Sequence, residues 1–447
     1  MCSPAVAVGQ QELTSAQMRE DLEQLTEALQ ARHPGLHRYA TQEEIAAAVA
    51  AAHQAIAEPL ETLAFFRVIA PLLATVRCGH TTARPGNGYV QSLMQHAKLL
   101  PCDVALLGDR TFVTSWHEPA SSQPNGCELL SLDGVALSEL RERLLPSMRG
   151  DGYIPTARLR ELEQQFSLYY ALLVDTKPEG EFQVEIRAPG QSTTTTSVAG
   201  KRFSPPRGGL DGAPIEFAVL PDEVGLLTVR TFSSGAMERQ DIDYRAFLRA
   251  TFEQLRQDEI GHLIVDLRGN TGGTDQMGAL LVSYLCPEAF GYFERIEVTA
   301  SYSGEGGIES DAAGRRLVTE HPGTQPQEPA DVPFGGKLAL LVDGRTFSTA
   351  ADVATVVHHK QRAIFFGEEV GGGYDGNSSG VMHTETLAHS GIMVRIPLWM
   401  YTTANLGHER RGRGVPVDYE LQPTIDDVIA GRDPVLAKAV AELRDSE

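Results

Sequence analysis

Several classes of protein are excluded by what this 447-residue sequence lacks. Its apolar runs all fall short of the roughly 20 residues that a membrane-spanning helix needs. Acidic residues outnumber basic ones by 59 to 38, and the net charge of -21 argues against binding to nucleic acid or to an anionic membrane surface. The five cysteines include no CxxC pair, so we expect neither a zinc site nor a disulfide framework. The remaining composition is that of an ordinary globular protein.

The N-terminus bears on the location of the protein. It shows no basic segment followed by an apolar core, so we expect no signal peptide. Cys2 is nevertheless compatible with the lipid-attachment cysteine of an exported lipoprotein in which an initiator methionine replaces the signal. We therefore favour the bacterial cell envelope as the location, as a periplasmic protein or a lipoprotein, with the cytoplasm as the alternative.

Composition and periodicity divide the chain into four segments. Residues 1–90 are predicted to form a helical domain, because apolar residues recur at helical spacing and the runs end at proline and glycine. Residues 91–200 combine short strand-like runs with helices, which predicts a small mixed α/β module. The stretch 189–214 is rich in Gly, Pro, Ser and Thr and is predicted to be a linker. Alternating strands and helices indicate an α/β core at 215–430, before a C-terminal helix at 431–447.

A serine at a strand-to-helix junction is the first candidate for chemistry. The pattern predicts a strand at 338–342 and a helix at 349–357, with Ser348 directly before the helix. The first amides of a helix have no partner within the helix and carry partial positive charge. That setting suits a nucleophile whose attack creates an anion. Serine is also a favoured N-cap residue, so capping alone is the competing interpretation of Ser348.

A glycine-rich turn follows another predicted strand. Gly269, Gly272 and Gly273 lie between a buried strand and a helix, where glycines let the backbone turn sharply and present amides. The spacing fits neither common phosphate-binding pattern. An oxyanion hole for acyl transfer and a simple tight turn are the two remaining interpretations.

One histidine lies in a setting that suits a catalytic role. His80 occupies a break between Gly79 and Thr81 rather than a helix face. His358 and His359 lie about 15 Å along the helix from Ser348, at 1.5 Å per residue, so neither can act as its base.

Three motifs taken together resemble the tail-specific, or C-terminal-processing, serine protease family. They lie at 266–273, 344–352 and 367–373, in the order and close to the spacing of that family. The resemblance implies a core like those of ClpP and the crotonases, and a small inserted mixed α/β module that is PDZ-like. It further implies a serine peptidase that acts on peptides or proteins and forms an acyl-enzyme. No metal or organic cofactor is implied, and a homo-oligomer is compatible with the family.

The same resemblance assigns roles to individual residues. It makes Ser348 the nucleophile and the amides of Thr349 and of the Gly272–Gly273 pair the oxyanion hole. No lysine follows Ser348 at the spacing of the Ser-Lys branch, so the chain is similar to the tricorn-like branch, which uses a histidine. His80 matches the motif of that histidine, and a neutral imidazole can take the serine proton near pH 7.

The carboxylate that would complete a triad is less closely defined. Glu409 precedes a segment, 414–418, that resembles the Gly-Val-x-Pro-Asp motif of the family, so it is the predicted third member. Glu368 and Asp375 are the competing carboxylates. A surface ion pair with a neighbouring arginine is the alternative role for Glu409.

Two other functions remain open on the sequence. The chain could bind an apolar ligand on the same fold, as retinoid-binding relatives of the family do, or act as an esterase or acyl-transfer enzyme on small molecules. The presence of both Ser348 and His80 favours the peptidase.

Overall fold

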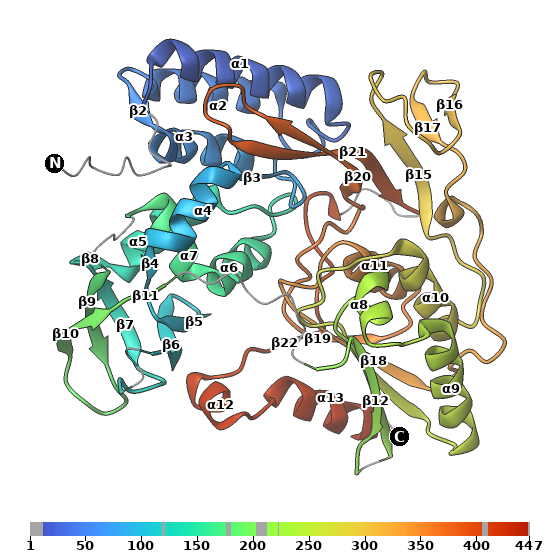
Figure 1. Cartoon of the computed structure of the whole chain (residues 1–447). Coiled ribbons are helices and arrows are strands. Elements are labelled where there is room, and N and C mark those ends of the chain that lie inside the picture. The colour runs from blue at the N-terminus through green and yellow to red at the C-terminus, as the bar shows by residue number, and fades with distance from the viewer. Residues whose placement is uncertain are drawn as a thin grey trace.

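The protein is a mixed α/β molecule, seen here in a computed structural model (Figure 1). The structure describes residues 12–118, 120, 122–175, 180–202, 212–221, 223–404 and 410–445, without the side chains of 92–96. Cys2, on which the expected envelope location depends, lies outside these ranges. No helix within them is long and apolar enough to cross a membrane.

The described part of 1–90, the segment predicted to be helical, is built mainly of helices. Thr14 and Thr41 each form a capping box, which explains why the first two helices begin where they do. The elements of this part are β1 (Glu12–Leu13), α1 (Ser15–Arg32), α2 (Gln42–Ala55), β2 (Leu60–Glu61), α3 (Thr62–Thr75), β3 (Thr82–Arg84) and α4 (Asn87–His96). The break between α3 and β3 contains His80, so the packing of these two elements positions that side chain.

An antiparallel sheet in the order β10-β9-β7-β6-β5 forms the inserted module. The strands are β5 (Cys102–Leu107), β6 (Arg110–Trp116), β7 (Glu128–Leu132), β9 (Glu181–Arg187) and β10 (Thr194–Ala199), with the short β8 (Val135–Ala136) on β7. The helices are α5 (Leu137–Leu144), α6 (Pro155–Gln164) and α7 (Phe166–Leu173), with the 3-10 turn η1 (Leu145–Ser147). The short strands β4 (Lys98–Leu99) and β11 (Lys201–Arg202) pair with each other.

The predicted linker at 189–214 is wrong over part of its length. Residues 194–199 form β10, which pairs antiparallel with β9 from Thr194 opposite Ile186 to Ala199 opposite Glu181. A run of threonines, which are β-branched, favours a strand once a partner strand is available.

The core sheet has the order β12-β13-β14-β18-β19-β22, and only β12 is antiparallel to its neighbour. Its strands are β12 (Ile215–Val219), β13 (Val224–Val229), β14 (His262–Asp266), β18 (Lys337–Val342), β19 (Ile364–Gly367) and β22 (Tyr419–Glu420). The helices of this region are α8 (Ser234–Arg239), α9 (Tyr244–Gln257), α10 (Asp275–Leu285), α11 (Thr349–His359), α12 (Ile425–Ala430) and α13 (Pro434–Asp445).

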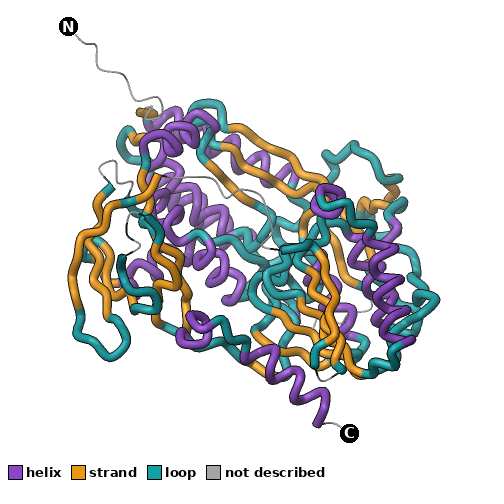
Figure 2. Tube along the Cα trace, turned by 60° about the horizontal axis from the view of Figure 1, so that its bottom comes forward, coloured by secondary structure: helices purple, strands orange, loops and turns teal. Residues whose placement is uncertain are grey.

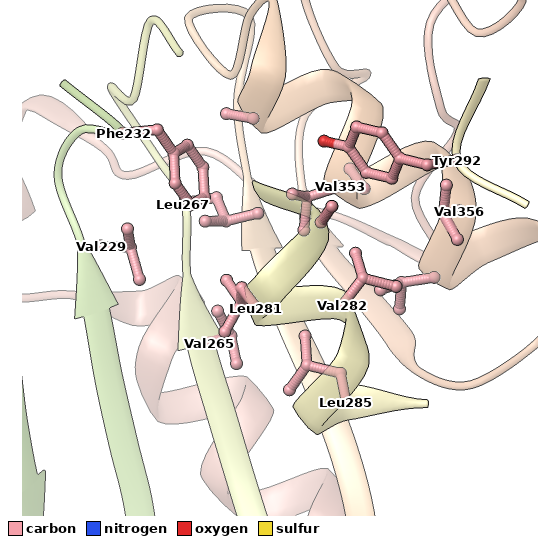
Figure 3. Packing of buried hydrophobic residues seen from close by; sticks show 14 of the residues in the cluster. Val229, Phe232, Val265, Leu267, Leu281, Val282, Leu285, Tyr292, Val353 and Val356 are labelled. Carbon is pink, nitrogen blue, oxygen red and sulfur yellow. The ribbon is translucent and has the colours of Figure 1, made fainter. Parts of the chain in front are cut away.

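Successive apolar side chains of a strand point to opposite faces of this sheet, so both faces must be covered. Leu263 and Val265 face the main core, while Ile264 between them faces a second cluster. The main core contains residues of α9, α10 and α11, and Figure 3 shows Val265 of the sheet beside Leu281 of α10. The second cluster contains Val435, Ala439 and Leu443 of α13, so the C-terminal helix covers the other face.

A second large sheet joins the N-terminal helices to the core. Its order is β16-β17-β15-β21-β20, and β3 also pairs with β21. The elements are β15 (Phe293–Val298), β16 (Ile308–Ser310), β17 (Arg316–Val318), η2 (Pro322–Thr324), β20 (Ser378–Thr386) and β21 (Met393–Thr403). In Figure 2 the strands of the inserted module and those of the core lie on opposite sides of the molecule. The pairing of β3 with β21 fixes the segment that contains His80 against the core.

Candidate active site

Three loops meet at one edge of the core sheet. Because β14, β18 and β19 are parallel neighbours, their carboxyl ends lie side by side. The segments that follow are the glycine-rich turn at 267–274, the turn that ends at Ser348, and the loop at 368–377. The fold therefore brings together the three motifs that the sequence analysis singled out.

Ser348 has an unusual backbone conformation at this edge. Its φ of 55° and ψ of -131° lie outside the regions that non-glycine residues normally adopt, a form of strain that is concentrated at functional sites. Ser348 is the N-cap of α11, yet its side chain makes no capping hydrogen bond. The hydroxyl Oγ instead lies 3.2 Å from Nε2 of His80. Side-chain capping therefore does not account for this serine.

His80 is electrostatically suited to accept a proton. Burial, assisted by the charges of Arg149 and Arg395, lowers the pKa of His80 to about 3, so the ring is neutral at pH 7. Its ring also lies against Phe347, with 4.6 Å between the ring centroids. The other ring nitrogen, Nδ1, is buried and has no hydrogen-bond partner among the described residues. A neutral ring with its proton on Nδ1 leaves Nε2 free to accept the hydrogen of the serine hydroxyl.

The two candidate oxyanion glycines differ in their hydrogen bonding. Gly272 has a φ of +95°, and a Cβ placed on it would lie 2.7 Å from Ser348 Cβ and 2.8 Å from Thr349 N. Its own amide donates to Asn270 Oδ1 at 2.8 Å. Within the part of the chain that the structure describes, the amides of Gly273 and Thr349 donate to no acceptor. Gly272 is therefore where close approach to the serine requires glycine, and the other two amides remain available.

Two of the three carboxylates named from the sequence, Glu368 and Asp375, make no hydrogen bond or ion pair with His80 in the described structure. Glu368 accepts hydrogen bonds from Arg160 at 2.8 and 2.6 Å. Asp375 accepts a hydrogen bond from Tyr39 Oη at 2.7 Å and pairs with Arg38 at 3.4 Å. Glu409 lies outside the described residues.

Asp151 is a carboxylate near His80 that sequence reasoning missed. It accepts a hydrogen bond from the amide of Gly79 at 2.7 Å, and its ligand atom lies within 4.8 Å of those of Cys78 and His80. Burial raises the pKa of Asp151 to about 6. The three residue types can ligate metals, but the positive charge of Arg149 acts on His80 and opposes a cation there. No local pattern identifies Asp151, because only tertiary packing brings the inserted module to this loop.

A cavity of about 360 Å³ is lined by His80 and by Phe347, the residue before Ser348. Its lining includes Gly79, His80, Arg149, Thr271, Arg345 and Phe347. Thr271 of the glycine-rich turn and the candidate base His80 therefore border one cavity, which offers a space for a substrate next to the residue before the serine.

Comparison with known proteins gives one family and a set of similar structures. Residues 223–421 match the sequence model of peptidase family S41. No curated protein is similar enough to match. The crystal structure of mature CPAF is 15% identical over 97% of this chain and 98% of that chain, with a TM-score of 0.69. Mature CPAF complexed with lactacystin is 16% identical over 96% and 97%, with a TM-score of 0.68. At this identity the likeness shows the fold.

Proposed function

We propose that this protein, whose residues 223–421 match the model of peptidase family S41, is a serine peptidase that cleaves peptide bonds through an acyl-enzyme on Ser348. The observation that carries the proposal is the 3.2 Å separation between His80 Nε2 and Ser348 Oγ. A nucleophile needs a base within hydrogen-bond reach, and this pair has that geometry. The strained backbone of Ser348 and the absence of a capping bond support the same assignment.

The reaction has two halves. In the first, Ser348 Oγ attacks the carbonyl carbon while His80 Nε2 takes its proton, and the C–N bond then breaks as His80 returns that proton to the leaving amine. In the second, a water molecule loses a proton to His80 and attacks the acyl ester, which releases the acid and restores the serine hydroxyl. The amides of Gly273 and Thr349 stabilise the oxyanion, and Gly272 lets the turn approach Ser348 closely.

A carboxylate that orients the ring of His80 would complete the site. Glu409 remains our proposed third member, from its place in the family motif. Among the described carboxylates, Asp151 acts closest to the histidine, because it accepts the hydrogen bond of the Gly79 amide next to His80. We assign Asp151 to positioning the His80 segment, since its oxygens accept backbone amides of Gly79 and Gly373.

We also propose a relation of the core and of the inserted module to known folds. A parallel sheet whose helices and turns gather at its carboxyl edge supports a core of the ClpP and crotonase type at 215–430. The antiparallel module within 91–200, with the turn after β7, supports a relation to PDZ domains. We also propose the boundaries of the helical domain at 1–90 and of the C-terminal helix at 431–447.

Labelling by a serine-reactive fluorophosphonate, together with hydrolysis of a mixed peptide library, tests the proposal. We expect Ser348→Ala to abolish both, and Ser310→Ala, which alters an exposed serine of β16, to change neither. Labelling that persists in Ser348→Ala would overturn the assignment of the nucleophile. Turnover of esters without peptides would favour the esterase alternative. Tight binding of an apolar ligand without any turnover would favour the binding protein.

A further inference from the structure

Arg345 lies in the turn between β18 and Ser348, three positions before the serine. Its backbone amide donates to Asp343 Oδ1 at 2.9 Å, which holds the turn in place. Its side chain is partly buried and lines the 360 Å³ cavity that also contains His80. It lines a second cavity too, of about 390 Å³, between the inserted module and the core. Arg345 therefore lines both the cavity that contains His80 and the cavity beside the inserted module.

The charges around the first cavity leave Arg345 uncompensated. Arg149 and Glu161 form a two-pronged pair at 3.0 and 3.2 Å, and so neutralise each other. His80 is neutral because burial lowers its pKa. Across the described ranges, the guanidinium of Arg345 makes no hydrogen bond or ion pair. The lining of this cavity thus has one net positive charge, supplied by Arg345.

The second cavity has the same sign of charge. Its lining contains three cations, Arg160, Lys201 and Arg345, and two carboxylates, Asp103 and Glu163, and Arg160 pairs with Glu163 at 2.6 Å. Lys201 is a further cation of this lining, and it too has no acidic partner within the described structure. The rest of the wall is largely apolar and includes Leu99, Cys102, Val104, Phe166 and Leu168.

The partly buried, unpaired guanidinium of Arg345 is suited to bind an anionic group of a ligand. Acidic side chains outnumber basic ones by 59 to 38, yet none of those described neutralises Arg345. A guanidinium loses solvation when it lines a cavity and regains the energy from a charge-assisted partner. Its planar fork of donors matches a carboxylate in two parallel hydrogen bonds. The uncompensated charge therefore selects for a carboxylate in whatever enters the cavity.

We propose that Arg345 is a specificity residue that binds a carboxylate of the substrate peptide beside the scissile bond, and that a neighbouring apolar side chain of the peptide enters the second cavity. This inference rests on the proposed peptidase function. The carboxylate can come from an aspartate or glutamate side chain or from a free C-terminus, and the test distinguishes these sources.

The test measures kcat/KM for sets of peptides that differ at one position near the cleavage site. Each set contains Glu, Gln and Lys at that position, with the C-terminus either free or amidated. We expect the wild-type enzyme to favour the carboxylate by about ten- to a hundredfold, the range for a hydrogen bond to a charged group. Loss of the preference on replacing Glu by Gln identifies a side chain, whereas loss on amidation identifies the C-terminus.

Two substitutions and a matched control locate the preference. Arg345→Gln should reduce it to within about twofold, and Arg345→Glu should invert it in favour of Lys, because the interaction is between charges. Arg256→Gln removes an equally unpaired, exposed arginine of α9 and should leave the preference of the wild type intact. Thermal unfolding checks that the variants are folded. If they are not, the wild-type preference should still fall at high salt, which screens an ion pair.

A wild-type enzyme that cleaves peptides without any carboxylate preference would overturn this inference and leave the proposed peptidase in place. A preference that survives in Arg345→Gln would overturn it in the same way. If no peptide is cleaved and Ser348 is not labelled by the probe, the proposed function itself fails, and the role of Arg345 fails with it.

Discussion

His80 Nε2 lies 3.2 Å from Ser348 Oγ, although 268 positions separate the two residues in the chain. The contact depends on two independent parts of the fold. Ser348 is held at the end of a strand of the parallel sheet, and His80 lies between α3 and the strand β3, which pairs with β21. A change that moves β3 relative to the core sheet should therefore displace His80 and lower the activity while Ser348 stays in place.

The low pKa of His80 makes a prediction for the pH dependence of activity. A base must be neutral to act, and a pKa of about 3 keeps the ring neutral far below the ordinary value of 6.5. We expect kcat/KM to stay level as the pH falls from neutrality to about 5, when measured on a neutral peptide. An acid limb close to pH 7 would contradict this. It would mean that Glu409, ionised against the ring as the proposed triad requires, raises the pKa of the histidine above the value that burial sets.

Glu409→Gln tests the carboxylate that we propose for the triad. If Glu409 orients His80, kcat should fall by about 10²- to 10⁴-fold, as when the triad carboxylate is replaced by its amide, while KM changes little. Glu420→Gln, in the strand β22, is a matched change in the same part of the chain and should have no such effect. A Glu409→Gln enzyme with full kcat would remove this residue from the mechanism.

Asp151 should make stability depend on pH in a direction opposite to that of most carboxylates. Burial raises its folded pKa to about 6, above the value near 3.8 expected for the unfolded chain. Between these two values the folded state binds the proton more tightly, so the stability due to this group is present at low pH and is lost as the pH rises. The loss amounts to about 3 kcal/mol, from roughly two pKa units.

Asp151→Asn should abolish that dependence, because the amide oxygen can still accept the hydrogen bond of Gly79 and does not ionise. The measurement is the free energy of unfolding of both proteins in urea between about pH 4 and 7. If the difference between the two proteins does not change with pH, Asp151 is not the raised group.

Two alanine substitutions in one turn separate backbone strain from steric conflict. Gly272→Ala places a Cβ 2.7 Å from Ser348 Cβ and 2.8 Å from Thr349 N, so it should displace the nucleophile and remove most of kcat. Gly269→Ala also has a positive φ, +72°, but its Cβ would meet nothing within 4 Å. It should cost about 1 kcal/mol of stability and retain activity. Comparable activity of the two variants in a peptidase assay would contradict the close approach of the turn to Ser348.

Glu368 should matter for stability rather than for chemistry. It forms a pair with Arg160 of α6, and the two side chains are only 6% and 11% exposed. This pair ties the inserted module to the core, and Gln422 also donates to Glu368. Glu368→Gln removes one of the two carboxylates that pair with Arg160 and leaves Glu163 at 2.6 Å, so it should cost less than the roughly 3–5 kcal/mol of a buried charge left with no partner.

The matched control for Glu368 is Arg432→Gln, which breaks an exposed pair with Asp427 and should cost less than about 1 kcal/mol. Urea unfolding measures both variants, and titration of the active site with the fluorophosphonate gives the activity per folded molecule. That activity should remain at the wild-type level for Glu368→Gln. Its complete loss would return Glu368 to the list of candidate triad members.

The local sequence pattern was sufficient to predict those helices and strands whose apolar residues follow a clear period or run. The strand β18 and the helix α11 lie close to the ranges predicted for them, 338–342 and 349–357, because a continuous apolar run defines the strand and a helical run follows the serine. The hairpin of β20 and β21 was not predicted. Much of β20 is exposed, and β21 gains its order from pairing with β15, β20 and β3, which lie far away in the chain.

The sequence by itself determined the local chemistry of the site: a serine directly before a helix, a glycine-rich turn after a strand, and a histidine in a glycine-flanked break. Each depends on neighbours a few residues away, so each leaves a readable pattern. Only the tertiary structure decided that His80 faces Ser348, that Asp151 lies behind the histidine, and that Arg345 has no acidic partner among the described residues. These relationships arise from packing between distant segments. Whether a charged side chain finds a partner depends on which segments surround it in space, and no single stretch of sequence records this.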